Sequence, residues 1–242
     1  YLKIGCDDRA ITSLPFNYSY GLSVINSHIF SGGSIVLSNS SMMEDKFWRS
    51  INDHSATSIA GVPYNYEMML RLGIDNLDIP TIKKMTQAGG KLNYQKAKKV
   101  NDSLQLKGVD FYTMYGQTEA TARISYLPCG NIDEKPNSIG IPIPGGKLWL
   151  EDEKGSKISD SMVVGELIYE GANVSMGYAE SINDLSSEDV NKGILRTGDL
   201  AYFDEDGYYF IEGRNNRFIK VFGNRISLDS LEKLITTKGF DS

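Results

Sequence analysis

The sequence predicts an α/β fold, with a parallel-sheet α/β subdomain followed by a small antiparallel β-barrel subdomain. From about residue 14 to residue 113, apolar β-prone runs alternate with helical patterns, as parallel α/β units require. After about residue 137, short strands separated by Gly, Pro and Asp-Gly replace this alternation. With 242 residues and 40% hydrophobic content, the chain is long enough to bury a sizeable core.

The first part contains four predicted strands with helices between them. The strands cover residues 34–38, 56–61, 83–88 and 109–113. Each helix is predicted from apolar residues that recur on one face, namely Phe47, Trp48 and Ile51, then Met68, Met69 and Leu72, then Ala97, Val100 and Leu104. We expect these faces to pack against the sheet.

The second part is predicted to be mainly β. Its expected strands are residues 139–149, 165–170 and 208–212, and Asp206-Gly207 is typical of a hairpin turn. A further strand is expected at 218–222, followed by a helix capped by Ser227. The predicted domains are therefore 1–137, 138–213, and 214–242 as a hinge and the start of a truncated C-terminal domain.

Composition narrows the functional class. A net charge of -6 argues against a nucleic-acid surface, which needs clustered Lys and Arg. Cys6 and Cys129 lie far apart without a CxxC pattern, which argues against a disulfide framework or zinc site and favours a reducing compartment. No apolar run has the length of a membrane helix, and no signal-peptide pattern is present. We predict a cytoplasmic protein with no nucleic-acid partner and no membrane span.

The run Tyr115-Gly116-Gln117-Thr118-Glu119-Ala120-Thr121 is the strongest candidate for a functional site. It follows a β-prone segment and is therefore expected past the carboxyl end of a strand, where open α/β sheets bind ligands. Tyr115 can stack on adenine, Thr118 can donate to a phosphate oxygen, and Glu119 can hold Mg²⁺. Taken alone, the run is equally well explained as an ordinary turn before a helix.

Two other segments have the chemistry of a nucleotide site. Gly89-Gly90 permits close approach of the backbone to a flat base, although paired glycines also form simple tight turns. Asp199 lies in a predicted Thr-Gly-Asp turn, where its carboxylate can accept both ribose hydroxyls, and Arg214 can reach the same sugar. Alternatively, Asp199 only bonds the backbone of its own turn, and Arg214 is an ordinary surface cation.

Five segments together resemble the adenylate-forming superfamily of acyl-CoA synthetases, peptide-synthetase adenylation domains and luciferases. Residues 115–120 match its YGxTE signature, and the remaining motifs are Leu14-Pro15-Phe16-Asn17-Tyr18-Ser19-Tyr20-Gly21-Leu22, Ala88-Gly89-Gly90-Lys91-Leu92, Gly165-Glu166-Leu167 with Gly171 and Gly177-Tyr178, and Arg196-Thr197-Gly198-Asp199-Leu200 with Gly213-Arg214. The resemblance covers nearly the whole chain and implies the large-domain fold of this superfamily.

The resemblance also implies roles for individual residues. Thr118 and Glu119 would be catalytic, with Glu119 as the metal ligand. The nucleotide would contact Gly89, Gly90, Lys91, Thr113, Met114, Tyr115, Gly116, Asp199 and Arg214. Tyr18, Gly61, Val62 and Tyr64 would line the substrate pocket, and Asn216 would be the hinge residue.

The activity implied is ATP-dependent activation of a carboxylic acid. The acid attacks the α-phosphate of Mg-ATP to give an acyl-adenylate and pyrophosphate, and the acyl group then passes to CoA or to the phosphopantetheine of an acyl carrier protein. Relatives that activate amino acids carry an Asp in the early motif, whereas this chain has Asn17 and Tyr18 there. An acyl, aryl or hydroxy acid is therefore favoured over an ordinary α-amino acid.

Some superfamily elements are missing or altered. The phosphate-binding loop would precede Tyr1 and the adenylation lysine would follow Ser242, while Asn216 occupies a hinge position that is commonly Asp or Lys. We therefore expect a central fragment that is inactive or severely impaired by itself. The alternatives are an adenylation domain of a peptide-synthetase-like assembly and a catalytically inactive nucleotide-binding fragment.

Overall fold

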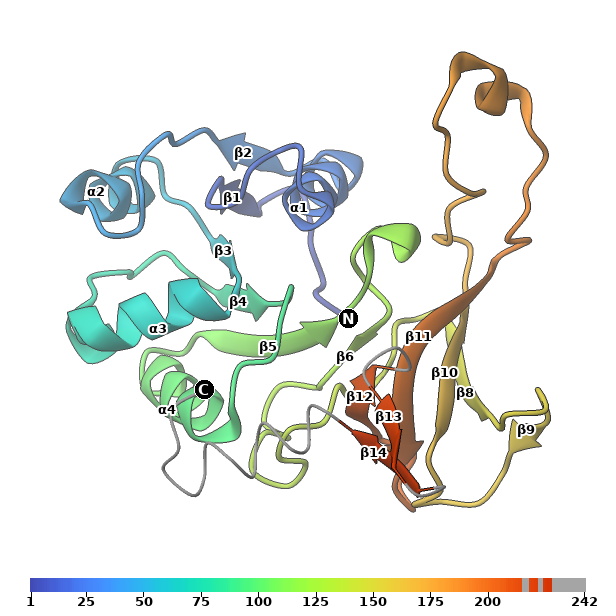
Figure 1. Cartoon of the computed structure of the whole chain (residues 1–242). Coiled ribbons are helices and arrows are strands. Elements are labelled where there is room, and N and C mark those ends of the chain that lie inside the picture. Colours follow the sequence, from blue (N-terminus) through green and yellow to red (C-terminus); the bar gives the residue numbers. More distant parts are fainter. Residues whose placement is uncertain (215–217, 222–223, 228–242) are drawn as a thin grey trace. The chain divides into compact units, whose positions relative to one another are not determined.

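The computed structural model describes residues 1–214, 218–221 and 224–227 (Figure 1). In its first part, strands and helices alternate along the chain, as the sequence predicts. The helices are α1 (Ser19–Phe30), α2 (Asp45–Asp53), α3 (Pro63–Leu72) and α4 (Tyr94–Gln105), with short 3₁₀ helices η1 (Ile74–Asn76) and η2 (Thr118–Ala120).

A seven-stranded sheet forms the centre of this part, in the order β2-β1-β3-β4-β5-β6-β7. The strands are β1 (Arg9–Ile11), β2 (Ser34–Val36), β3 (Ser58–Gly61), β4 (Lys84–Gln87), β5 (Asp110–Tyr115), β6 (Ser125–Tyr126) and β7 (Ile141–Pro142). The strands β1 to β5 are parallel to one another, whereas β6 is antiparallel to β5 and β7 is antiparallel to β6. The carboxyl ends of β3, β4 and β5 therefore lie along one edge.

Most of the predicted helix faces are buried. Phe47 and Ile51 on α2, and Val100 and Leu104 on α4, are fully buried, which confirms those faces. Leu72 is 41% exposed, so its assignment to the buried face is wrong. It is the last residue of α3, and the chain turns away at Gly73 in a left-handed conformation.

Two elements near the start of the chain were not predicted. β1 has only three residues, too few for a periodic pattern to stand out. In α1, Ser, Gly, Asn and His interrupt the apolar positions, and both Ile29 and Phe30 are exposed. The helical period is therefore weak in a segment that tertiary contacts hold in place.

The second part contains a five-stranded antiparallel sheet in the order β12-β11-β10-β8-β9. Its strands are β8 (Lys147–Glu151), β9 (Lys157–Ile158), β10 (Gly165–Glu170), β11 (Ile194–Phe203) and β12 (Tyr209–Arg214). A long connection containing η3 (Ile182–Ser186) joins β10 to β11 (Figure 1). Among the described residues this sheet is open, with β12 and β9 as its edge strands. The predicted fold class, an α/β part followed by an antiparallel β part, is confirmed.

The predicted strand at 139–149 is two strands in two different sheets. Its first portion is β7 of the seven-stranded sheet, and its second portion is β8 of the five-stranded sheet. Pro144, Gly145 and Gly146 separate them, and Gly145 has a φ of 85°, which breaks an extended strand. An apolar run can therefore cross a boundary between sheets.

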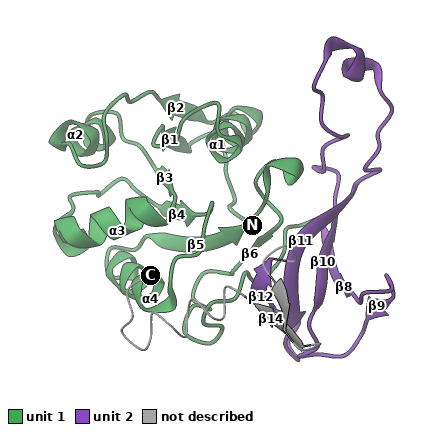
Figure 2. Cartoon of the chain, viewed as in Figure 1, with its two compact units in different colours: residues 1–144 green, residues 145–242 purple. Residues whose placement is uncertain are grey.

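The chain divides into two compact units, Tyr1–Pro144 and Gly145–Ser242, which are coloured separately in Figure 2. The predicted limits at 137 and 213 remain predictions. β13 (Phe218–Val221) and β14 (Asn224–Ser227) form an antiparallel pair at the predicted strand. The hinge residue Asn216 and the predicted helix after Ser227 lie outside the described residues. No helix in the described part is long and apolar enough to cross a membrane.

Candidate functional site

The sheet register places three predicted site segments side by side. Gly61 at the end of β3 pairs with Gln87 at the end of β4, and Gln87 pairs with Thr113 of β5. Ligands in open α/β sheets bind at such an edge, just beyond the carboxyl ends of the strands. Past these three paired residues, β3 leads into Val62, β4 leads into the turn at Gly89-Gly90, and β5 leads into the 115–121 segment.

The turn at Gly89-Gly90 has a backbone that favours glycine at both positions. Their φ angles are 76° and 151°, and the side-chain amide of Gln87 donates to the Gly90 carbonyl at 2.9 Å. A Cβ at Gly89 would overlap the Tyr18 hydroxyl and stand 3.2 Å from Val62 Cγ1. The structure therefore brings the predicted adenine wall against two predicted substrate-pocket residues.

The 115–121 segment forms a closed loop after β5. The Ile124 amide donates to the Tyr115 carbonyl and the Ala122 amide donates to the Gln117 carbonyl, each at 2.9 Å. A Cβ at Gly116 would collide with the Ala122 backbone, so only glycine fits there. Thr121 and Ala122 have φ angles of 50° and 64°, which are unfavourable for residues with side chains. This loop is therefore tightly constrained.

The predicted catalytic residues lie on the first turn of η2. Thr118 is exposed, and its Oγ1 lies 3.0 Å from the Oγ of Ser19, the first residue of α1. Glu119 is half-buried. No cluster of three or more His, Cys, Asp or Glu that could hold a metal is found among the described residues. One carboxylate nevertheless suits Mg²⁺, which binds through one or two carboxylates plus substrate phosphates.

The remaining predicted residues of this unit differ in exposure. Met114 is only 6% exposed and packs in an apolar cluster, which leaves its backbone as the group that can face a ligand. Tyr115 is half-buried, and its hydroxyl accepts a hydrogen bond from Gln117 Nε2 at 3.2 Å. Lys91 is exposed, and Tyr64 on the first turn of α3 is 62% exposed.

A largely apolar cavity also opens in this unit. It comprises about 250 Å³, part of it open to solvent, and its lining includes Ile11, Val24, Ile35 and Ala60 from β1, α1, β2 and β3. None of the four predicted pocket residues lines this cavity. The lining does include Phe16 and Ala60, which belong to the segments that carry the predicted pocket residues, so the position of the acid pocket stays a prediction.

In the second unit, Asp199 and Arg214 are paired across neighbouring strands. They face each other in the β11–β12 register, and Arg214 Nε lies 3.1 Å from Asp199 Oδ1. The Asp199 side chain is only 5% exposed, whereas that of Arg214 is 68% exposed. The two predicted ribose ligands are thus brought together, one of them buried and the other largely exposed.

The predicted turn around Asp199 is wrong in detail, because these residues lie within β11. Gly198 has a φ of 69°, and the register of β11 shifts against both β10 and β12 here. Thr197 Oγ1 donates to the Leu167 carbonyl at 2.7 Å and accepts from the Asp199 amide at 3.1 Å. The Thr-Gly-Asp sequence therefore forms a bulge in a long strand, which local turn propensity did not distinguish from a true turn.

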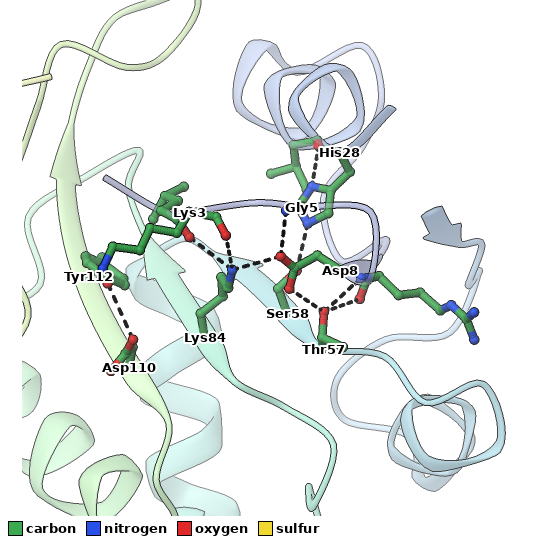
Figure 3. Close-up of polar contacts among 12 residues, drawn as sticks. Lys3, Gly5, Asp8, His28, Thr57, Ser58, Lys84, Asp110 and Tyr112 are labelled. Atoms are coloured by element: carbon green, nitrogen blue, oxygen red, sulfur yellow. Dashed lines mark hydrogen bonds and ion pairs between the residues drawn. The ribbon is translucent and has the colours of Figure 1, made fainter. Parts of the chain in front are cut away.

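Sequence reasoning missed a buried polar network at the amino ends of β1, β3 and β4 (Figure 3). Lys84 Nζ lies 3.1 Å from Asp8 Oδ2 and donates to the carbonyls of Leu2 and Lys3 at 3.0 and 3.3 Å. Asp8 also accepts from the Thr57 hydroxyl at 3.1 Å. Burial raises the pKa of Asp8, but the Gly5 amide and the Lys84 ammonium outweigh it and bring that pKa below its ordinary value.

This network holds the first eight residues in place next to the candidate site. Leu2 is buried in one apolar cluster with Tyr20, Ala88 and Met114, and Tyr1 packs against that cluster. The Tyr20 hydroxyl also lies 2.7 Å from Thr86 Oγ1 on β4. A lysine within a predicted strand was the one sequence signal, because an interior charge needs a buried partner.

His28 on α1 completes the buried polar groups in Figure 3. One ring nitrogen lies 2.8 Å from the Val24 carbonyl and the other lies 3.1 Å from Ser58 Oγ on β3. Burial lowers the pKa of His28 below its ordinary value, although the Val24 carbonyl acts in the opposite direction. The neutral ring therefore ties α1 to the central sheet.

Comparison with known proteins finds one matching family model and several similar enzymes. The family model described as AMP-binding enzyme matches residues 1–179. The luciferin 4-monooxygenase of Photinus pyralis is 29% identical over 233 residues, covering 94% of this chain and 41% of that protein. The 2-succinylbenzoate–CoA ligase of Bacillus pumilus is 29% identical over 231 residues, covering 96% of this chain and 46% of that protein.

Solved structures give the same result. The o-succinylbenzoate CoA synthetase of Bacillus subtilis, in complex with its acyl-adenylate intermediate OSB-AMP, matches with a TM-score of 0.81 and 27% identity. That match covers 98% of this chain and 47% of the synthetase. The same synthetase in complex with ATP and magnesium ion matches with a TM-score of 0.79 and 27% identity, covering 98% of this chain and 48% of the synthetase.

The chain thus spans less than half of the length of these relatives. The family model nevertheless covers well over half of the chain, and it includes all of the site residues described in the first unit. The predicted fold and the ordered motifs agree with this match. The chain belongs to the AMP-binding enzyme family.

Proposed function

We propose that this chain is part of an AMP-forming acid–thiol ligase. The enzyme would convert a carboxylic acid and ATP into an acyl-adenylate and pyrophosphate, and would then transfer the acyl group to CoA or to a carrier-protein thiol. The observation that carries the proposal is the row at the ends of β3, β4 and β5, where Gly61, Gly89-Gly90 and the YGQTE loop adjoin. The family match supports the reaction class.

Each part of the row would bind a different part of the ligands. The Gly89-Gly90 backbone would lie against the adenine, and the half-buried Tyr115 ring would stack on it. Thr118 would donate its hydroxyl hydrogen to a phosphate oxygen. Tyr18, Gly61, Val62 and Tyr64 would contact the acid. Because no side chain becomes covalently bound, catalysis rests on positioning and on neutralising charge.

Glu119 would hold Mg²⁺, which when bound supplies positive charge to the phosphates. Its half-buried carboxylate beside Thr118 has the oxygen chemistry that the ion prefers. In the second unit, the buried Asp199 would accept hydrogen bonds from the ribose hydroxyls, and Arg214 would hold that carboxylate in place. Thr113, Met114 and Gly116 would also contact the nucleotide, as would Lys91.

The acid is proposed to be an acyl, aryl or hydroxy acid, because Asn17 and Tyr18 supply no carboxylate for an α-ammonium group. A cytoplasmic location remains part of the proposal. We also propose that the 242 residues alone are inactive or severely impaired, because relatives of this family are more than twice as long.

The test is pyrophosphate release by the full-length protein across a panel of carboxylic acids with Mg-ATP. We expect release with at least one acyl, aryl or hydroxy acid, and formation of its CoA or carrier thioester. Glu119→Gln should reduce the rate at least tenfold, whereas Glu134→Gln, a change at an exposed carboxylate, should leave it unchanged. Absence of acid-dependent pyrophosphate release from the folded protein would refute the proposal.

A further inference from the structure

The contact between Ser19 and Thr118 joins two segments that lie far apart in the sequence. Ser19 Oγ and Thr118 Oγ1 are 3.0 Å apart, across 99 residues. Ser19 begins α1 directly after the predicted pocket residue Tyr18, and Thr118 begins η2 in the YGQTE loop. This hydrogen bond therefore connects the acid side of the proposed site to its phosphate side.

The backbones on both sides of the contact are held by other interactions. Hydrogen bonds from Ala122 and Ile124 close the loop that carries Thr118. On α1, the Tyr20 hydroxyl lies 2.7 Å from Thr86 Oγ1, and Arg123 Nη2 donates to the Ser23 carbonyl at 3.3 Å. The main freedom left to the Thr118 hydroxyl is rotation of its own side chain.

The chemistry of a hydroxyl sets the direction of this bond. A Thr hydroxyl has one hydrogen to donate and two lone pairs that accept. If Ser19 donates to Thr118 Oγ1, the hydrogen of Thr118 is free to point at a third group. Consecutive hydrogen bonds in the same direction also polarise and strengthen one another.

We propose that Ser19 is a positioning residue for Thr118. Ser19 donates to Thr118 Oγ1 and thereby directs the Thr118 hydrogen toward a phosphate oxygen of the bound nucleotide. The inference rests on the proposed function, because it needs a nucleotide at the YGQTE loop. It adds a residue of the substrate-side helix to the groups that orient the phosphates.

The first test is AMP affinity, measured by calorimetry on the full-length protein. Ser19→Ala should weaken binding by about 2- to 12-fold, the effect of one neutral hydrogen bond. Ser19→Thr should restore the affinity, since it restores the hydroxyl. Ser23→Ala is the matched control, because the Ser23 hydroxyl bonds only within α1, to the Tyr20 carbonyl at 2.8 Å. An equal loss in Ser19→Ala and Ser23→Ala would overturn the inference.

A double-mutant cycle separates positioning from simple structural support. In a Thr118→Val background the acceptor hydroxyl is gone, so adding Ser19→Ala should cause no further loss of AMP affinity. The same loss in both backgrounds would mean that Ser19 acts independently of Thr118, and would overturn the inference. The midpoint of urea unfolding of each variant shows whether the protein remains folded.

A ligand-free measurement keeps this inference distinguishable from the proposed function. The χ1 rotamer of Thr118 is read from three-bond couplings of its methyl group by NMR. One rotamer in the wild type, with averaging in Ser19→Ala but not in Ser23→Ala, supports the positioning role even if the wild type binds no AMP and the proposed function fails. Averaging already in the wild type would overturn the positioning role whether or not AMP binds.

Discussion

Replacing Lys84 with Met should strongly destabilise the first unit. The Lys84 and Asp8 side chains are 11% and 10% exposed, and Lys84 Nζ makes three polar contacts between 3.0 and 3.3 Å. Methionine keeps most of the length of the side chain but leaves the Asp8 carboxylate and two backbone carbonyls without the ammonium. Removing one partner of a buried ion pair costs about 3–5 kcal/mol, and we expect Lys84→Met to fall in that range.

The assay is urea unfolding followed by tryptophan fluorescence. The chain has two tryptophans, Trp48 in the first unit and Trp149 in the second, so a Trp149→Phe background reports on the first unit alone. Lys96→Met is the matched control, because Lys96 pairs with Glu67 at 2.6 Å while the two side chains are 45% and 32% exposed. Exposed pairs contribute about 0.2–1 kcal/mol, so this control should change the unfolding free energy little.

A double substitution tests the cause of the loss. If an unpaired buried charge is responsible, Asp8→Leu combined with Lys84→Met should be less destabilising than Lys84→Met alone, since no buried charge remains. The reasoning is refuted if Lys84→Met costs no more than Lys96→Met. It is also refuted if the double variant is as unstable as the two single losses added together.

Three further predictions follow from contacts in the buried polar network and at the candidate site. His28 has a pKa below its ordinary value when folded, so its contribution to stability is complete above about pH 6.5 and is lost as the pH falls through that lower pKa; His28→Asn should remove this part of the pH dependence of the urea midpoint. Gly89→Ala should destabilise the first unit by about 1–3 kcal/mol, measured by urea unfolding, because the new Cβ meets the Tyr18 hydroxyl; Tyr18→Phe in the same background should recover part of the loss. Asp199→Ala in the full-length protein should weaken AMP binding by about 1.5–3 kcal/mol in calorimetry, the contribution of a hydrogen bond to a charged group.

Each of these predictions has a contrary result. An unchanged pH slope in His28→Asn would show that the buried ring does not control the acid side of the stability curve. Full stability of Gly89→Ala would show that the Tyr18 hydroxyl is not held against this turn. For the ribose assignment, Asp206→Ala in the exposed β11–β12 turn is the control, and an AMP affinity as high in Asp199→Ala as in Asp206→Ala would contradict the assignment.

Local patterns predicted the elements with strong periodicity. The segments 56–61, 83–88 and 109–113 contain β3, β4 and most of β5, and residues 165–170 are β10. β3 and β4 are fully buried, and β10 is mostly buried, so the apolar pattern of these segments agrees with their place in a sheet. β1, α1 and the bulge in β11 were missed because their conformations depend on contacts with distant segments.

The candidate site was predicted in its motifs but not in its supporting contacts. Gly89, Thr118 and Asp199 came from recognisable sequence segments. Their partners Tyr18, Ser19 and Arg214 act at contacts across 71, 99 and 15 residues, respectively. Motif reasoning names a residue and its chemistry, whereas the partner that orients its side chain depends on which segments the fold makes adjacent.

By itself, the sequence determined the fold class, the family and the chemical types present at the site. These follow from local hydrophobic patterning and from short motifs, both of which are properties of contiguous residues. Only the tertiary structure decided that Gly61, Gln87 and Thr113 share one row, that Lys84 is paired with Asp8, and that Ser19 meets Thr118. The physical reason is that strand register, buried charge pairs and side-chain hydrogen bonds join residues distant in the chain, and only global packing sets those distances.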